Sequence, residues 1–240
     1  MIPKIIHYCW FGRGEKPKLA KKCIESWKEY CPDYEIKEWN EDNFDLDLYP
    51  YAREAYDNRK YAFVTDVVRL YALVTEGGVY MDTDVEVIRP IDRFLNHHAF
   101  SGFQDYVSFP TGIMASEKGS KWALDNLNYY NNRHFIKEDG SLDIGKTNVE
   151  AIMEVMQPYN VKIDNTYQDF EGYFTLYPKE YFCPTEHVND IKITKNTYTI
   201  HHFAGSWTPW HVRFKRKIIR FLGKRLWNFI ISIRERIFNK

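Results

Sequence analysis

Two aspartates one residue apart interrupt an otherwise apolar run of the chain. The run GGVYMDTDVEV occupies residues 77–87 and contains Asp82 and Asp84. A carboxylate is costly to bury alone, so two of them at the end of a core strand call for a cation. Side chains two residues apart share one face of a strand, and Mg²⁺ or Mn²⁺ prefers oxygen ligands and can bridge phosphates. We interpret this run as a site for a divalent metal and nucleotide phosphates.

A short Asp-x-Asp pair is not specific to one kind of site. It can be a pair of solvated turn residues, because short motifs often occur without function. An EF-hand loop is excluded, since its glycine is missing and Val85 and Val87 stand where ligands belong. The pair that opens a phosphatase site is a nearer competitor, although Glu86 stands where that motif has Thr or Val. The phosphatase therefore stays an alternative.

A second charged pair lies on a helix predicted over residues 61–76. Asp66 and Arg69 are three residues apart, so they share one face of that helix. The helix is otherwise apolar on nearly all sides, which is typical of a buried helix. The pair is either an ion pair within the helix or a device that holds a polar ligand beside the two aspartates.

Two histidines, His201 and His202, end the last predicted strand. Imidazole is a good ligand for ions such as Mn²⁺, although a histidine in a β-rich core is more often structural. The loop that follows contains Ser206 and Trp207, which can donate hydrogen bonds to a phosphate. The strand-end position keeps both a structural and a ligand role open for the histidines.

Strands and helices alternate along the chain, which predicts an α/β fold. The first strand ends at Trp10 beside a glycine-containing turn, an arrangement typical of the start of a nucleotide-binding sheet. The expected elements are strands at 2–10, 34–39, 85–88, 99–103, 111–115 and 197–202, and helices at 17–29, 61–76, 120–130 and 148–156.

Composition narrows the class of protein. The chain has 240 residues, of which 44% are hydrophobic and 17% aromatic, enough for a sizeable core and for rings that stack on sugars or bases. Its four cysteines have neither disulfide density nor metal-binding spacing, which favours a reducing compartment. We see no signal peptide and no apolar run that would span a bilayer. A cytoplasmic or peripheral protein is expected.

The C-terminal residues 212–240 are strongly basic. They contain ten Lys or Arg and one acid, Glu235, so the rest of this formally neutral chain is acidic. Apolar residues recur there at helical spacing, which predicts a basic amphipathic helix. Such a helix can pack on the acidic body, but we favour an anionic membrane surface as its partner. No nucleic-acid-binding module accompanies it. We predict a globular domain over 1–211 and this helix over 212–240.

Four separated motifs, in order, make the chain resemble the glycosyltransferases with a sugar-binding Asp-x-Asp motif. This group, which is family 32-like, includes the yeast initiating mannosyltransferase, bacterial capsular polysaccharide transferases and, more distantly, the glucosylating clostridial toxins. The resemblance implies a GT-A fold, in which donor and metal bind at the C-terminal edge of a mainly parallel sheet flanked by helices. The motifs are IPKIIHYCWFG at 2–12, FVTDVVRLYA at 63–72, GGVYMDTD at 77–84 and HHFAGSW at 201–207.

The resemblance also implies donor-binding roles. Trp10 would stack on the nucleotide base, and Asp66 and Arg69 would hold the donor sugar. Asp82 would contact the ribose and sugar hydroxyls. The expected catalytic set is Asp66, Arg69, Asp82 and Asp84.

Metal-binding roles follow from the same resemblance. Asp84 would ligate Mn²⁺ or Mg²⁺ directly, with Asp82 beside it. His202 would be the downstream ligand, and His201 is a further candidate. Residues 206–207 would donate hydrogen bonds to the diphosphate or contact the metal.

The expected function is a metal-dependent hexosyltransferase. It would move a sugar from a UDP- or GDP-hexose to a glycan or lipid-linked saccharide, with retention of anomeric configuration. We expect it to build a polysaccharide such as a capsule or O-antigen at the inner face of the cell membrane. The alternatives are a noncatalytic nucleotide-sugar-binding module and the phosphatase.

Overall fold

The computed structural model describes residues 1–187 and 190–205. A seven-stranded sheet forms the centre of this part of the chain. Its strands are β1 (Ile5–Cys9), β2 (Glu35–Trp39), β3 (Gly78–Met81), β5 (Ala99–Gly102), β6 (Ile113–Ser116), β7 (Gln168–Phe170) and β8 (Phe174–Tyr177). The order across the sheet is β2-β1-β3-β6-β5-β8-β7. β1, β2, β3, β5 and β8 run in one direction, and β6 and β7 run in the other, so the predicted mainly parallel α/β sheet is confirmed.

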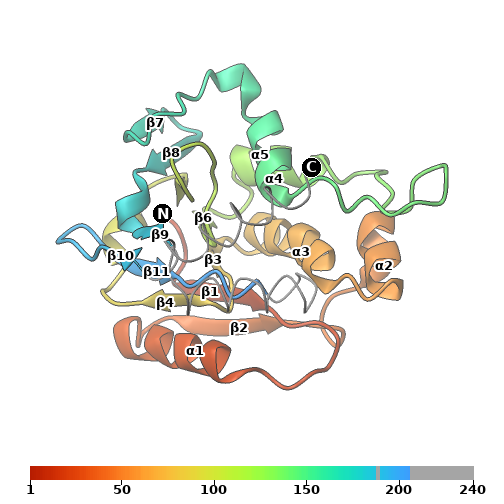
Figure 1. Cartoon of the computed structure of the whole chain (residues 1–240), viewed down its shortest axis with the longest axis horizontal. Coiled ribbons are helices and arrows are strands. Elements are labelled where there is room, and N and C mark those ends of the chain that lie inside the picture. Colours follow the sequence, from red (N-terminus) through yellow and green to blue (C-terminus); the bar gives the residue numbers. More distant parts are fainter. Residues whose placement is uncertain (188–189, 206–240) are drawn as a thin grey trace, which may run out of the picture.

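Helices cover both faces of the sheet. They are α1 (Lys18–Tyr30), α2 (Pro50–Asp57), α3 (Tyr61–Thr75), α4 (Lys121–Asn128) and α5 (Asn148–Val155). Side chains alternate along β3, so Tyr80 packs in one core with α3, whereas Val79 packs in another with Trp27 of α1. Figure 1 shows α3 and α1 on opposite sides of β1, with α2 and α4 beside α3. β3 is therefore buried on both faces and directs its carboxyl end into the site.

A glycine pair turns α3 directly into β3. Gly77 has a φ of +71°, and its N–H donates to the carbonyl of Leu73 at 3.0 Å, which ends the helix. At Gly78, with a φ of +115°, a Cβ atom would lie 2.7 Å from the carbonyl oxygen of Ile5 on β1. Only glycine allows this backbone conformation and this close approach. The tight connection holds the charged residues of α3 beside the end of β3.

A two-stranded antiparallel sheet completes the site. It pairs β4 (Val85–Val87) with β11 (Thr199–His201), and it places His201 opposite Val85. β3 ends at Met81, and residues 82–84 form a turn in which the N–H of Val85 donates to the carbonyl of Asp82 at 3.0 Å. The expectation that both aspartates share one strand face is wrong, because residues 82–84 form a turn after β3 has ended.

The predicted elements have counterparts within a few residues of their expected bounds. The elements that were not predicted are α2, β7, β8 and the short pair β9 (Thr185–His187) and β10 (Asp190–Ile191). The basic helix predicted over 212–240 lies outside the described residues, as do Ser206 and Trp207. No helix among the described residues is long and apolar enough to cross a membrane.

Candidate active site

The charged pair of α3 is buried and reaches the Asp-x-Asp turn. Asp66 and Arg69 are 7% and 6% exposed. Nη2 of Arg69 lies 3.2 Å from Oδ1 of Asp66 and 3.5 Å from Oδ1 of Asp82, and Nε donates to the carbonyl of Thr65 at 3.2 Å. The pair is therefore an intrahelical ion pair and also a link from α3 to the turn.

Tyr80 contacts both Asp82 and Arg69 and so stabilises this link. Its phenolic O–H donates to Oδ1 of Asp82 at 2.9 Å, and the Arg69 guanidinium lies 4.7 Å from the centre of its ring. A guanidinium over an aromatic face is attracted by the electrons of the ring. Because Tyr80 is 1% exposed, it fixes both charged groups from inside the core.

Backbone groups fix the other aspartate. Oδ2 of Asp84 accepts the N–H of Ala204 at 2.7 Å, and its backbone carbonyl accepts the N–H of His202 at 3.0 Å. On the other side of the turn, the N–H of Asp82 donates to the carbonyl of Gly112 at 2.8 Å. The turn is held between the segment after β11 and the loop before β6.

His201 completes a cluster of possible metal ligands. Its Nε2 lies 3.4 Å from Oδ1 of Asp84, and its Nδ1 lies 3.3 Å from the hydroxyl of Thr111. Ligand atoms of Asp82, Asp84 and His201 all lie within 4.8 Å of one another. Carboxylate oxygens suit Mg²⁺ or Mn²⁺, and the imidazole nitrogen suits a transition metal such as Mn²⁺ better than Mg²⁺, so the residues fit the metal that the sequence predicts.

Burial and charge shape the protonation of the site. Burial raises the pKa of Asp66 to about 7, although the Arg69 charge opposes the rise. Burial by itself would lower the pKa of His201, but hydrogen bonds with Asp84 and Cys183 raise it to about 10. Burial acts in the opposite direction on Asp84 and would raise the pKa of its carboxyl group. The hydrogen bond and charge of His201 outweigh burial and bring this pKa below its usual value. Without a metal, Asp84 and His201 form an ion pair, so a cation would replace the His201 proton.

Two predicted site residues lie apart from this cluster. Nε2 of His202 is 2.8 Å from Oε2 of Glu86, which also binds Lys22 at 2.8 Å, so its ring makes a different contact from that of His201. Trp10 follows β1, is half-buried, and donates its indole N–H to the carbonyl of Gly14 at 2.6 Å. Thus His201 rather than His202 joins the two aspartates.

Three supporting residues, Tyr80, Thr111 and Gly112, were not predicted from the sequence. Tyr80 stands two residues before Asp82, so strand periodicity carried a signal for it. At Gly112 a Cβ atom would come within 3.0 Å of Oδ2 of Asp82 and of Cε1 of His201. That close approach depends on long-range packing and leaves no local pattern.

A family comparison bears on this geometry. Residues 17–101 match the model of the glycosyltransferase sugar-binding region containing a DXD motif. This part of the chain is therefore similar to the sugar-binding region of DXD glycosyltransferases. This region includes Asp66, Arg69, Asp82 and Asp84, whereas His201 comes from outside it.

The matches to two curated relatives are longer than the family match. The chain is 32% identical over 127 residues to inositol phosphoceramide mannosyltransferase 3 of Schizosaccharomyces pombe, covering 51% of this chain and 35% of the relative. It is 24% identical over 208 residues to mannosyl phosphorylinositol ceramide synthase SUR1 of Saccharomyces cerevisiae, covering 81% of this chain and 54% of the relative. The chain thus spans about a third to a half of the length of these relatives.

Similarity to a solved structure shows the type of fold. The PaToxG glycosyltransferase superposes with a TM-score of 0.53 at 18% identity, covering 66% of this chain and 70% of that chain. The fold is therefore of the GT-A type, as the sequence analysis expected.

Proposed function

We propose that this protein is a metal-dependent glycosyltransferase that transfers a sugar from a nucleotide-sugar to a glycan or lipid-linked acceptor. The observation that carries the proposal is the meeting of two groups of residues at Asp82. On one side are the ligand atoms of Asp84 and His201. On the other is the buried pair Asp66 and Arg69. The sugar-binding region and the mannosyltransferase names of the relatives support the same activity.

The residues divide the work of the reaction. Asp82, Asp84 and His201 would hold a divalent cation, which neutralises the charge that grows on the departing diphosphate. Arg69 offers a fixed fork of N–H donors, and Asp66 accepts hydrogen bonds, so the two would orient donor hydroxyls. Their burial leaves little solvent to compete for these contacts. Trp10, at the end of β1, remains our candidate for the base contact.

The finer assignments are part of the proposal. The donor is a UDP- or GDP-hexose, and mannose is the first sugar to test because the relatives are named for its transfer. The cation is Mn²⁺ or Mg²⁺, and the product retains the anomeric configuration. Those names refer to inositol phosphoceramide as acceptor, so they support a lipid acceptor and give no support to the capsular pathway.

The first test is nucleotide release from a panel of UDP- and GDP-sugars, with and without Mn²⁺. The variant is Asp84→Asn, which keeps the volume and an acceptor for the N–H of Ala204 but removes the charge. The matched control is Asp57→Asn, at an exposed aspartate at the end of α2. We expect the parent protein and the control to cleave one donor, and to do so only when metal is present. Asp84→Asn should not cleave it. Unchanged turnover in Asp84→Asn without metal contradicts the metal assignment.

Two other results of that experiment would favour other functions. Tight donor binding in calorimetry without any release, even with acceptors present, would indicate a noncatalytic binding module. Phosphate release from simple phosphoesters, with nucleotide-sugars left intact, would indicate the phosphatase.

We also propose that residues 212–240 bring the enzyme to an anionic membrane at the cytoplasmic side. Their ten basic residues are the support. The test is sedimentation with phosphatidylglycerol or phosphatidylcholine vesicles, comparing the full chain with a chain ending at His211. Binding of both chains to both vesicles, or of neither chain, contradicts the proposal.

A further inference from the structure

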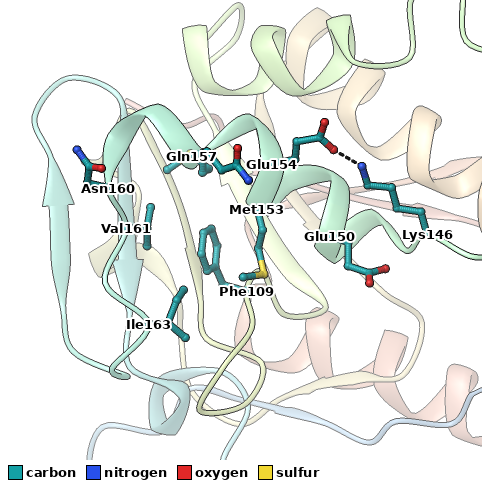
Figure 2. A pocket seen from close by; sticks show the side chains of 10 residues that line it. Phe109, Lys146, Glu150, Met153, Glu154, Gln157, Asn160, Val161 and Ile163 are labelled. Atoms are coloured by element: carbon teal, nitrogen blue, oxygen red, sulfur yellow. Dashed lines mark hydrogen bonds and ion pairs between the residues drawn. The ribbon is translucent and has the colours of Figure 1, made fainter.

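A cavity of about 520 Å³ lies beside α5, away from the residues that the proposed chemistry uses. Met153 and Met156 line it from α5 and its end, and Val161 and Ile163 line it from the segment that follows. Phe109 lines it from the loop between β5 and β6. Figure 2 shows Phe109 between Met153 on one side and Val161 and Ile163 on the other. The volume falls within the range of small-molecule sites, roughly 300–1,000 Å³.

The topology places this cavity at the same edge of the sheet as the metal-ligand cluster. β3 and β5 are oriented alike, and β6 and β7 run opposite to them, so the end of β3, the β5–β6 loop and the segment before β7 share one edge. Phe109 is three residues before Gly112, whose carbonyl accepts the N–H of Asp82 at 2.8 Å. Three residues span at most about 10 Å. A molecule in the cavity therefore lies within reach of the turn.

The apolar half of the lining, made by Phe109, the two methionines, Val161 and Ile163, favours an uncharged, apolar group. The cationic side chain in the lining, Lys146, is paired with Glu154, and Oε2 of Glu150 accepts the N–H of Thr147 at 2.8 Å as a cap of α5. A phosphate therefore finds no unmatched cation in this lining. Methionine side chains are flexible and adapt to irregular apolar ligands. Gln157 and Asn160 also line the cavity, and both are exposed, so their amides can remain in contact with water.

We propose that this cavity binds the hydrocarbon part of an amphipathic acceptor, whose hydroxyl head then extends along the β5–β6 loop toward Asp82. The proposal rests on the proposed function, because it names the class of acceptor for the same site. Apolar contact in the cavity would hold the acceptor hydroxyl near the donor and so convert an encounter into a positioned reaction.

A binding experiment tests this directly, without any donor. The chain has five methionines, of which only Met153 and Met156 line the cavity. The protein is labelled with ¹³C at the methyl group of methionine. The NMR signals of the two methionines are assigned from their disappearance in the Met153→Leu and Met156→Leu variants. Octyl glucoside is added below its critical micelle concentration, and methyl glucoside is the matched ligand. We expect octyl glucoside to shift the Met153 and Met156 signals and methyl glucoside to leave them unchanged.

The opposite results overturn the proposal. Equal shifts with both glucosides would mean that the sugar ring occupies the cavity. An absence of shifts at the two methionines would mean that nothing of this kind binds there. Since no donor is present, a failure of sugar transfer leaves this result intact, and a failure here leaves the nucleotide-release test intact.

A charged variant provides the second measurement. Met153→Glu places a carboxylate in the apolar lining, and we expect the affinity for octyl glucoside to fall by about tenfold or more. The control is Val155→Glu, on the same helix and equally half-buried but outside the cavity lining. Circular dichroism checks that both variants fold. Equal losses of affinity in both variants would count against the cavity.

Discussion

The phenolic O–H of Tyr80 donates to Oδ1 of Asp82 at 2.9 Å, and the same ring lies beneath the guanidinium of Arg69. A buried hydroxyl thus determines how the first aspartate of the Asp-x-Asp turn presents its second oxygen. In the proposed reaction Tyr80 is a positioning residue, because it acts through Asp82 and Arg69.

Tyr80→Phe removes the hydroxyl and keeps the ring under Arg69. We expect the free energy of unfolding to fall by roughly 1 kcal/mol, as for the loss of one hydrogen bond. The Mn²⁺ concentration for half-maximal nucleotide release should rise by about 10-fold or more, because Asp82 loses its orientation. A fall in maximal turnover with an unchanged Mn²⁺ requirement would argue against positioning. Urea unfolding and an Mn²⁺ titration supply the two readouts.

The two adjacent histidines give opposite expectations. His201→Ala removes a ligand atom from the cluster, so metal-stimulated nucleotide release should be lost. His202→Ala removes a contact with Glu86, which keeps its ion pair with Lys22, so most of the activity should remain. Mn²⁺ binding followed by calorimetry on both variants separates a lost ligand from a lost fold. The reverse ranking would restore His202 as the ligand.

Gly112→Ala tests the close approach of the β5–β6 loop. The new Cβ atom would meet Val85 at 2.9 Å and Asp82 and His201 at 3.0 Å, so these side chains must shift. We expect Mn²⁺ affinity to fall by about 10- to 100-fold with the fold retained. The matched control is Gly145→Ala, where a Cβ atom would meet nothing within 4 Å. Equal Mn²⁺ affinity in both variants would show that the cluster tolerates the shift.

His7 predicts how stability depends on pH. Burial lowers the pKa of its side chain below 6.5, and the ring sits between Trp39, which donates to Nδ1 at 3.1 Å, and the carbonyl of Gly77 at 2.7 Å. As pH falls through about 6.5, the unfolded chain takes up a proton that the folded chain refuses. The stabilising contribution is thus present above that pH and declines below it.

Urea unfolding at pH 7.5 and 5.5 measures this dependence. We expect the parent protein to lose stability over that interval, and His7→Gln to show a smaller loss, even though it is less stable overall. The control is Asn131→Gln, at an exposed position without a titratable side chain, which should lose as much stability over the interval as the parent protein. Identical losses in all three proteins would mean that other groups determine the pH response.

The sequence predicted the part of the site that local patterns encode. Asp82 and Asp84 interrupt an apolar run, and Asp66 and Arg69 interrupt an apolar helix, so each pair stands out from its surroundings. The choice between His201 and His202 was beyond local reasoning. It depends on the register of β11 against β4, which long-range pairing determines.

The helices and strands also differed in how well local sequence patterns predicted them. α3 has a continuous apolar pattern and a glycine pair at its end, and its predicted bounds differ from the structure by one residue. β7 and β8 are three and four residues long, too short for an alternating pattern to rise above the surrounding sequence. The cavity beside α5 joins segments that only the folded sheet brings together.

The pairing of β4 with β11 also determines when the site comes into existence. A ribosome makes both aspartates long before it makes His201, and the sheet edge around the turn can fold in the meantime. The last ligand arrives only when β11 adds to β4. A metal held by all three proposed ligands would therefore bind only after synthesis has passed residue 201, and a chain that ends earlier would have the turn without its third ligand.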